Sequence, residues 1–241
     1  MTPAETLPAV RTRIKICGLT REQDVDAAVA AGADAVGFVL YPPSPRYVTP
    51  QRAAELARRL PVFVTPVLLF VNAGSALART CGAALAHATF QFHGDESVAD
   101  CLEATDQGAR AYVRAARIPL GASAPAFDLV KYAHDYQSAQ AILLDAHVEG
   151  YGGGGKTFNW SQLPPSVNCH LVLGGGLTPA NVTDGILQLR PRCKTLAVDV
   201  STGVEMSKGI KDAGKIFQFV AAVRAADSQL ANNHDARLPA T

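Results

Sequence analysis

Short apolar runs alternate along the chain with longer stretches in which apolar residues recur at helical spacing. Each short run is rich in Val, Ile, Leu, Ala or Phe and is followed by a polar or glycine-containing break, a pattern typical of a buried parallel strand. Their separation is roughly that of one strand–helix unit. Eight strands are predicted in this way, at 13–16, 35–40, 66–70, 89–92, 111–114, 141–144, 170–173 and 195–198.

Capping and turn residues mark the expected ends of the helices between these strands. Thr20 and Gln23 have the spacing of a capping box, and Gly32 stands where a glycine would end the same helix. Thr49-Pro50 and Thr178-Pro179 each place a hydroxyl group before a proline at the first helical position. A last helix is expected from about residue 212 onward, with apolar residues on one stripe.

Regular alternation of strands and helices implies parallel strands with right-handed crossovers, which eight units can satisfy as a closed barrel or as an open, doubly wound sheet. No GxGxxG turn follows the first strand, as a dinucleotide-binding sheet would require. We therefore expect an α/β fold, a single (β/α)8 TIM barrel over residues 1–225. Residues 226–241 are polar and are expected to form a loose C-terminal tail.

Composition and charge argue against several classes of protein. The 241 residues carry a formal net charge of +1, with 48% hydrophobic and 18% charged residues, which excludes a disordered chain and argues against a nucleic-acid partner. The most apolar run, 62–71, is interrupted by Thr65 and Pro66 and is shorter than the roughly 20 residues that a membrane span needs. Five cysteines without CxxC spacing, and an N-terminus without an apolar leader, indicate reduced thiols in a cytoplasmic protein.

In a barrel of this kind the chemistry lies where strands run into the following loops, so those junctions carry the candidate residues. Glycine-rich clusters occur there at 152–155, 174–176 and 201–203. Their backbone N–H groups could bind a phosphate, or the glycines could simply make tight turns. No GxxxxGK[ST] motif is present, so hydrolysis of a nucleoside triphosphate is not supported.

Two titratable groups at strand ends are suited to acid and base catalysis. Cys17 ends the first strand and shares a face with Lys15, whereas the apolar Ile14 and Ile16 must face the helices. Lys15 could favour the thiolate of Cys17, although a buried cysteine can also merely fill space. Asp145 follows a buried strand, where it could be a proton donor or a turn residue.

Further charged residues are expected near these two. Because the first and eighth strands are neighbours in a closed barrel, Lys15 and Asp199 are predicted to form an interior ion pair. Arg46 lies in a proline-stiffened loop, where its guanidinium could bind a carboxylate or phosphate or remain in solvent. His93 and Arg114 are weaker candidates for the same site.

Specific motifs fall at successive strand ends, at 15–20 (KICGLT), 37–39 (GFV), 44–48 (SPRYV), 91–94 (QFHG), 144–146 (LDA), 152–155 (GGGG), 158–160 (FNW), 175–177 (GGL), 179–182 (PANV) and 199–205 (DVSTGVE). In kind and order they resemble those of the phosphoribosylanthranilate isomerases of tryptophan biosynthesis, over about residues 13–220. The family implies a barrel of the ribulose-phosphate-binding type. It also implies an intramolecular oxidoreductase that converts N-(5-phosphoribosyl)anthranilate to 1-(2-carboxyphenylamino)-1-deoxyribulose 5-phosphate by an Amadori rearrangement, without metal or cofactor.

The resemblance implies a role for each matching residue. Cys17 corresponds to the general base, Asp145 to the general acid, and Arg46 to the residue that contacts the anthranilate carboxylate. Residues matching the phosphate-binding loops are Gly153, Gly154, Gly155, Gly175, Gly176, Ser201, Thr202 and Gly203.

Departures from the family pattern are modest. Asn159 stands where Asp is common, Gly174 stands where Ala is frequent, and the loop at 152–155 reads GGGG where GGTG or GGSG is usual. They bear on the geometry of the phosphate loop. The expected partner is a phosphorylated small molecule, and the chain is expected to be a monomer or a homodimer. The alternatives are another phosphosugar-binding barrel enzyme and a non-catalytic phosphate-binding barrel.

Overall fold

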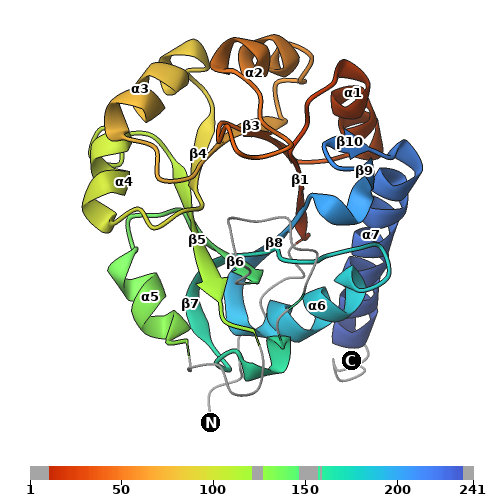
Figure 1. Cartoon of the computed structure of the whole chain (residues 1–241). Coiled ribbons are helices and arrows are strands. Elements are labelled where there is room, and N and C mark those ends of the chain that lie inside the picture. The colour runs from red at the N-terminus through yellow and green to blue at the C-terminus, as the bar shows by residue number, and fades with distance from the viewer. Residues whose placement is uncertain (1–10, 121–126, 147–156, 158, 236–241) are drawn as a thin grey trace.

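The computed structural model describes residues 11–120, 127–146, 157 and 159–235. Within these residues, eight parallel strands close into a barrel in chain order, with β8 hydrogen-bonded to β1 (Figure 1). The predicted closed barrel is thereby confirmed. The strands are β1 (Arg13–Cys17), β2 (Ala35–Val39), β3 (Thr65–Phe70), β4 (Thr89–Phe92), β5 (Tyr112–Ile118), β6 (Ala141–Ala146), β7 (Val167–Leu173) and β8 (Cys193–Val200).

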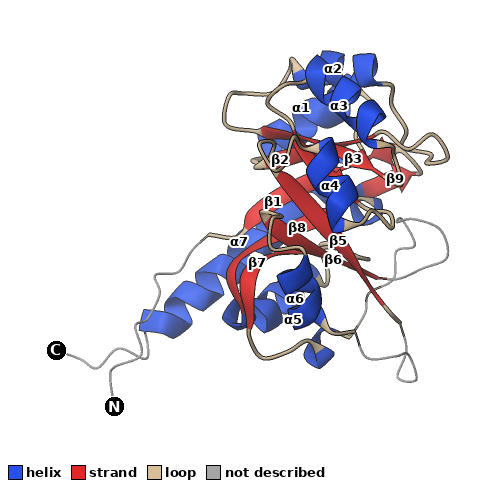
Figure 2. Cartoon of the chain, turned by 90° about the vertical axis from the view of Figure 1, so that its left-hand side faces the viewer, coloured by secondary structure: helices blue, strands red, loops and turns tan. Residues whose placement is uncertain are grey.

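Helices surround the barrel, as the two perpendicular views show (Figures 1 and 2). They are α1 (Glu22–Ala31), α2 (Pro50–Ala57), α3 (Ser75–Ala84), α4 (Val98–Ala104), α5 (Leu129–Asp135), α6 (Val182–Leu189) and α7 (Ala213–Asp235). Short 3-10 turns lie at η1 (Trp160–Gln162), η2 (Arg190–Arg192) and η3 (Thr202–Val204). A small antiparallel hairpin of β9 (Glu205–Ser207) and β10 (Ile210–Lys211) follows β8 and precedes α7.

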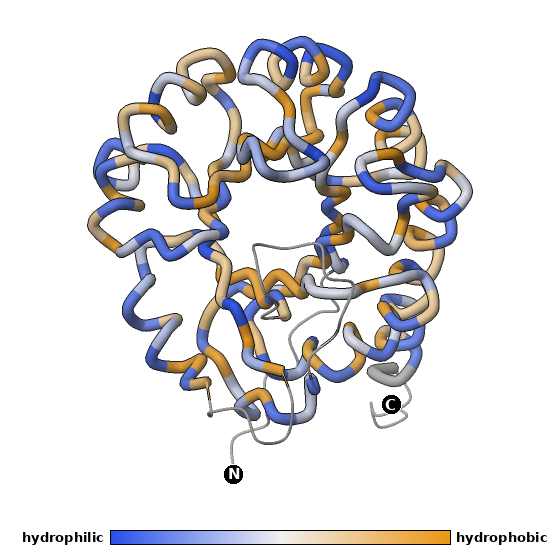
Figure 3. Tube along the Cα trace, viewed as in Figure 1, coloured by the Kyte–Doolittle hydropathy of each residue, from blue (hydrophilic) through white to orange (hydrophobic). Residues whose placement is uncertain are grey.

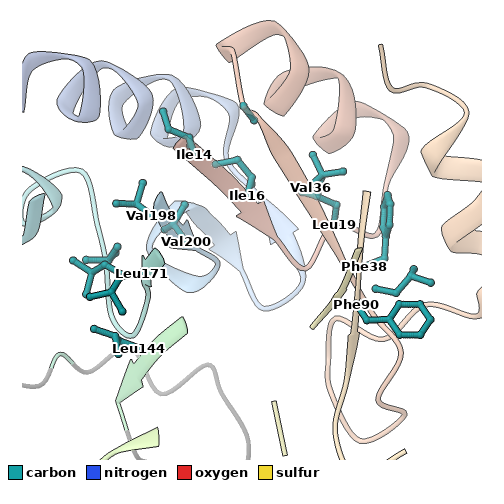
Figure 4. Packing of buried hydrophobic residues seen from close by; sticks show 14 of the residues in the cluster. Ile14, Ile16, Leu19, Val36, Phe38, Phe90, Leu144, Leu171, Val198 and Val200 are labelled. Carbon is teal, nitrogen blue, oxygen red and sulfur yellow. The ribbon is translucent and has the colours of Figure 1, made fainter. Parts of the chain in front are cut away.

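Alternation along the strands separates two environments. Outward-facing apolar side chains form a continuous buried layer under the helices, of which Ile14 and Ile16 on β1 and Val198 and Val200 on β8 are examples (Figure 4). Apolar residues concentrate along the strands, whereas polar residues recur on the surrounding helices (Figure 3). The intervening positions of each strand point into the barrel, so they can carry polar side chains without disturbing this layer.

Two of the four predicted helix-boundary signals hold. Thr49 caps α2 by accepting a hydrogen bond from the backbone N–H of Arg52 at 3.1 Å, and Gly32 ends α1 with a left-handed backbone, φ +90°. The capping box at Thr20 was a wrong prediction, because its hydroxyl donates to the carbonyl of Gly209 in the β9–β10 connection at 2.8 Å. The start predicted at Thr178 is also wrong: α6 begins at Val182.

The loose tail predicted from residue 226 is corrected by the structure. Helix α7 continues to Asp235, and Ala226 on this helix is fully buried. Asp227 accepts hydrogen bonds from the backbone N–H of Thr12 at 3.0 and 3.1 Å and from the Thr12 hydroxyl at 2.6 Å. Residues 236–241 lie outside the described part of the chain.

We predict that Asp227→Ala lowers the free energy of unfolding by about 2 kcal/mol, since it leaves the buried N–H and hydroxyl of Thr12 without their acceptor. Urea titration followed by circular dichroism measures the change. Gln229→Ala, an exposed position two residues further along the same helix, is the control and should change stability by less than about 0.5 kcal/mol. Equal midpoints for the two variants would show that this tie between α7 and the start of β1 contributes little.

Candidate active site

The interior of the barrel holds the predicted ion pair. Lys15 on β1 and Asp199 on β8 stand opposite each other in the strand register, and Lys15 Nζ lies 2.8 Å from Asp199 Oδ1. Both side chains are almost fully buried. Burial opposes the charge on Lys15, but the nearby Asp199 and Cys17 outweigh it and raise the lysine pKa. The predicted pair is therefore confirmed.

Cys17 lies next to this pair, and the absence of a side chain at Gly37 on β2 leaves room for its thiol. Its register partner is Gly37, where a Cβ atom would stand 2.7 Å from Cys17 Sγ and 3.1 Å from Lys15 Nζ. A side chain at position 37 would therefore displace either the thiol or the ammonium group. Burial raises the pKa of Cys17, and the lowering by Lys15 and Lys211 does not offset it. Lys15 thus favours the thiolate, as expected, but without making it the predominant form near neutral pH.

Asp145 is the penultimate residue of β6, on the interior face, and is paired with the residue that follows β4. Its Oδ2 lies 2.8 Å from Nε2 of His93, which follows β4, and its Oδ1 accepts from the backbone N–H of Ala146 at 3.0 Å. Nδ1 of His93 lies 2.9 Å from the side-chain nitrogen of Gln91, also on β4. All three interior side chains are buried. His93, a weak candidate from the sequence, is therefore brought directly to the predicted acid.

Arg46 is buried, not solvated, and its guanidinium is held by a residue to which the sequence analysis gave no role. Nε and Nη2 of Arg46 each lie 2.7 Å from an oxygen of Glu205 on β9, and Nη2 is 3.2 Å from the Thr202 hydroxyl. Lys211 on β10, which the sequence analysis missed, contacts the same carboxylate at 2.9 Å and the Ser201 carbonyl at 3.1 Å. Burial lowers the pKa of Lys211. Burial by itself would raise the pKa of Glu205, but the hydrogen bonds and charges of Arg46 and Lys211 outweigh it and lower that pKa.

The loops after β7 and β8 lie against each other and against the acid. Gly175 and Gly176 have left-handed backbones, φ +72° and +68°, and a Cβ on Gly175 would stand 2.8 Å from Asp145 Oδ1. A Cβ on Gly203 would overlap the carbonyl of Leu177. Two of the three predicted phosphate segments are thus adjacent and closely packed. Gly153, Gly154 and Gly155 lie outside the described residues.

Comparison with known proteins decides the family. The family model described as N-(5'phosphoribosyl)anthranilate (PRA) isomerase matches residues 14–222. The chain belongs to this family. A relative named N-(5'-phosphoribosyl)anthranilate isomerase, from Dechloromonas aromatica, is 57% identical over 221 residues, which cover 92% of this chain and all of the relative.

Solved structures agree with this assignment. A phosphoribosylanthranilate isomerase in complex with reduced 1-(o-carboxyphenylamino)-1-deoxyribulose 5-phosphate is 32% identical, with a TM-score of 0.70 over 89% of this chain and 99% of its own. A structure of monomers of the dimeric phosphoribosylanthranilate isomerase from Thermotoga maritima has the same identity, TM-score and coverage. Both are barrels that the chain matches along nearly its whole described length.

Arg114, a weak candidate, is not in the mouth of this isomerase barrel. It faces the helices, where its guanidinium donates to the carbonyls of Phe92 and Gly94 at 3.0 Å each and lies 5.0 Å from the ring centroid of Tyr136. It therefore supports the turn that carries His93. Arg117 shares the interior face of β5 with Val113 and Ala115, and its register partner is Asp145. Sequence analysis missed it because the predicted strand ended at residue 114, although alternation carried further would have identified it.

Two further features of the isomerase fold concern metals and membranes. Among the residues that the structure describes, no group of three or more His, Cys, Asp or Glu side chains is placed to hold a metal ion. None of the helices in the described ranges combines the length and apolar character needed to cross a membrane.

The thiol environment gives a pH-dependent prediction. Because the thiolate forms above the thiol pKa, alkylation of Cys17 by iodoacetamide should accelerate as pH rises, with a midpoint above that of a free cysteine. Lys15→Met removes the cation that lowers this pKa and leaves Asp199, which raises it, so the midpoint should move to still higher pH. Lys131→Met, at an exposed lysine paired with Asp135, is the control.

Peptide mapping by mass spectrometry would follow Cys17 separately from the other four cysteines. An unchanged or lower midpoint in Lys15→Met, in a variant with the wild-type circular dichroism spectrum, would contradict the proposed electrostatics of the pocket.

Proposed function

We propose that this isomerase carries out its Amadori rearrangement in the barrel mouth, with Cys17 as general base and Asp145 as general acid. As a member of its family the chain is an aldose–ketose isomerase of tryptophan biosynthesis that acts on N-(5'-phosphoribosyl)anthranilate. The observation that carries the assignment of roles is the placement of one buried thiol and one buried carboxyl at the ends of β1 and β6, on the same interior face. Lys15 lies beside Cys17 and His93 lies beside Asp145, so the two groups have different surroundings.

The proposed steps use only these two groups. Protonated Asp145 donates its proton to the furanose ring oxygen, the C1–O bond breaks, and the electron pair on the anilino nitrogen forms a Schiff base with C1. The Cys17 thiolate then removes the proton from C2, which gives an enolamine. Addition of a proton at C1 and loss of the hydroxyl proton at C2 produce the 1-deoxyribulose ketone. One acid and one base are sufficient for this sequence.

Arg46 is the proposed contact of the anthranilate carboxylate, and its pairing limits how it can bind. Nε and Nη2 are already bonded to Glu205, so Nη1 is the nitrogen left to approach the substrate. Arg46, Lys211 and Glu205 together keep one net positive charge, which favours an anionic group. Because Glu205 fixes the guanidinium in advance, little side-chain entropy is lost on binding.

The substrate phosphate is proposed to bind at the loops after β7 and β8. Support comes from the close packing of the loops after β7 and β8, where Gly175, Gly176 and the segment 201–203 lie together. This is the recurrent phosphate position in such barrels. Gly153, Gly154 and Gly155 complete the proposed site on the evidence of the sequence motif alone.

We propose a cytoplasmic location and a monomeric or homodimeric state. Five free cysteines are consistent with a reducing compartment. Dimeric and monomeric structures exist in the family, and sedimentation velocity would distinguish the two states for this chain. The near-neutral charge argues against nucleic acid as a partner. No observation favours another phosphosugar reaction or a non-catalytic barrel.

Replacing either proposed catalytic group should abolish most of the activity. Cys17→Ala and Asp145→Ala are each expected to lower kcat by about 100-fold to 10,000-fold, with the fold intact by circular dichroism. The assay generates the substrate from anthranilate and phosphoribosyl pyrophosphate and follows the loss of its fluorescence, after subtraction of spontaneous hydrolysis. Cys169→Ala, at a partly exposed cysteine on β7, is the control. Activity within a few-fold of wild type in either of the first two variants would refute that role.

The role of Arg46 can be separated from a general effect on folding. Arg46→Gln should lower kcat/KM by about tenfold to hundredfold with the natural substrate, because a charge-assisted hydrogen bond to the carboxylate is lost. The phosphoribosyl adduct of aniline lacks that carboxylate, so wild type and Arg46→Gln should process it with similar kcat/KM. An equal loss with both substrates would mean that Arg46 acts only through the surrounding structure.

A further inference from the structure

Gln91 is a buried polar residue in the barrel interior to which the mechanism above gives no role. Its neighbours in the register are Leu69 on β3 and Val113 on β5, which offer no side-chain hydrogen bonds. Its amide nitrogen lies 2.9 Å from Nδ1 of His93. Its amide oxygen is buried and has no hydrogen-bond partner among the described residues. The amide is therefore directed at a single group, the imidazole of His93.

That contact determines which nitrogen of the imidazole carries the proton. A neutral imidazole has one N–H and one acceptor nitrogen. Because the amide NH2 of Gln91 donates to Nδ1, the ring proton is on Nε2, which then donates to Asp145 Oδ2 at 2.8 Å. The opposite amide orientation would place the proton on Nδ1 and turn a lone pair toward the carboxyl group. The orientation of one amide thus decides whether Asp145 has a hydrogen-bond donor across the barrel.

We propose that Gln91 is a positioning residue for the acid, acting through the tautomer of His93. With the proton on Nε2, His93 holds Oδ2 while the backbone N–H of Ala146 holds Oδ1, and the carboxyl plane is fixed. The same His93 N–H stabilises the negative charge that develops on Asp145 as its proton passes to the ring oxygen. Arg117 is the register partner of Asp145 on β5. The inference rests on the proposed role of Asp145.

The direct test is nitrogen-15 NMR of the histidine rings in the wild-type protein. Protonated and unprotonated ring nitrogens have distinct shifts, and the signals of His93 are identified by their loss in His93→Asn. The expected result at neutral pH is a protonated Nε2 and an unprotonated Nδ1 at His93. A proton on Nδ1 in the wild-type protein would overturn the proposal without any substitution at Gln91.

Two substitutions at Gln91 then test the consequence for catalysis. Gln91→Glu presents only acceptors, so Nδ1 should become protonated; Gln91→Leu presents neither, so both tautomers should be populated. Both variants should lower kcat about tenfold or more while KM changes less than about threefold, since substrate contacts are untouched. Gln218→Leu, on the exposed face of α7, is the matched control.

The outcomes separate this inference from the proposed function. Wild-type tautomer and wild-type kcat in both Gln91 variants would overturn the positioning role, even if Asp145→Ala is inactive. An altered tautomer with unchanged kcat would show that Gln91 sets the proton on His93 but that catalysis does not depend on it, which also contradicts the proposal. Full activity of Asp145→Ala would instead remove the acid itself, whatever the NMR result.

Discussion

The closure of the barrel between β1 and β8 is the constraint on which the site depends. Its register brings Lys15 opposite Asp199 and buries the two charges as a pair. Removing one partner of such a pair leaves an uncompensated buried charge, which typically costs about 3–5 kcal/mol. Cys17 stands two residues beyond Lys15 on the same face, so the register that neutralises the lysine also decides where the thiol lies. Gly37 on β2 supplies the space that both groups need.

Three groups in the mouth are built from paired polar side chains. Lys15 with Asp199 forms one, His93 with Asp145 the second, and Arg46 with Glu205 and Lys211 the third. Buried charges must be paired or hydrogen-bonded, and each group satisfies this internally. Only the third group has an excess cation, at the side where the anthranilate carboxylate is proposed to bind. The proposed base, the proposed acid and the proposed carboxylate contact therefore have different electrostatic surroundings, although all three lie in the same barrel mouth.

Local patterns in the sequence were sufficient to predict the barrel and most residues of the site. Strand alternation placed Lys15, Cys17 and Asp199 on the interior face correctly, because pleating is a local property. Lys211 was not assigned a role because its partner Glu205 lies in a hairpin after the eighth strand that the sequence did not predict. Glu205 was not assigned a role because it pairs with Arg46 across more than 150 residues of chain. No local pattern encodes such a contact.

The remaining errors have different origins. Arg114 was expected in the mouth because it ended the predicted fifth strand, whereas β5 continues to Ile118 and pleating puts Arg114 and Arg117, three residues apart, on opposite faces. The tail from residue 226 was expected to be loose because it is polar, yet Ala226 is buried and Asp227 accepts hydrogen bonds from Thr12, just before β1. At this end of α7 a contact with a distant residue, not local composition, fixed the outcome.

The most direct measurement is a crystal structure of this protein with reduced 1-(o-carboxyphenylamino)-1-deoxyribulose 5-phosphate. The account predicts that Cys17 Sγ lies within about 3–3.5 Å of C2 of the bound molecule. It predicts that an Asp145 oxygen lies within hydrogen-bond reach of the oxygen derived from the sugar ring. The aromatic carboxylate should meet Arg46 Nη1 and the phosphate should lie at Gly175, Gly176 and 201–203. A molecule bound in the mouth with either Cys17 or Asp145 out of reach of these atoms would contradict the assignment of base and acid.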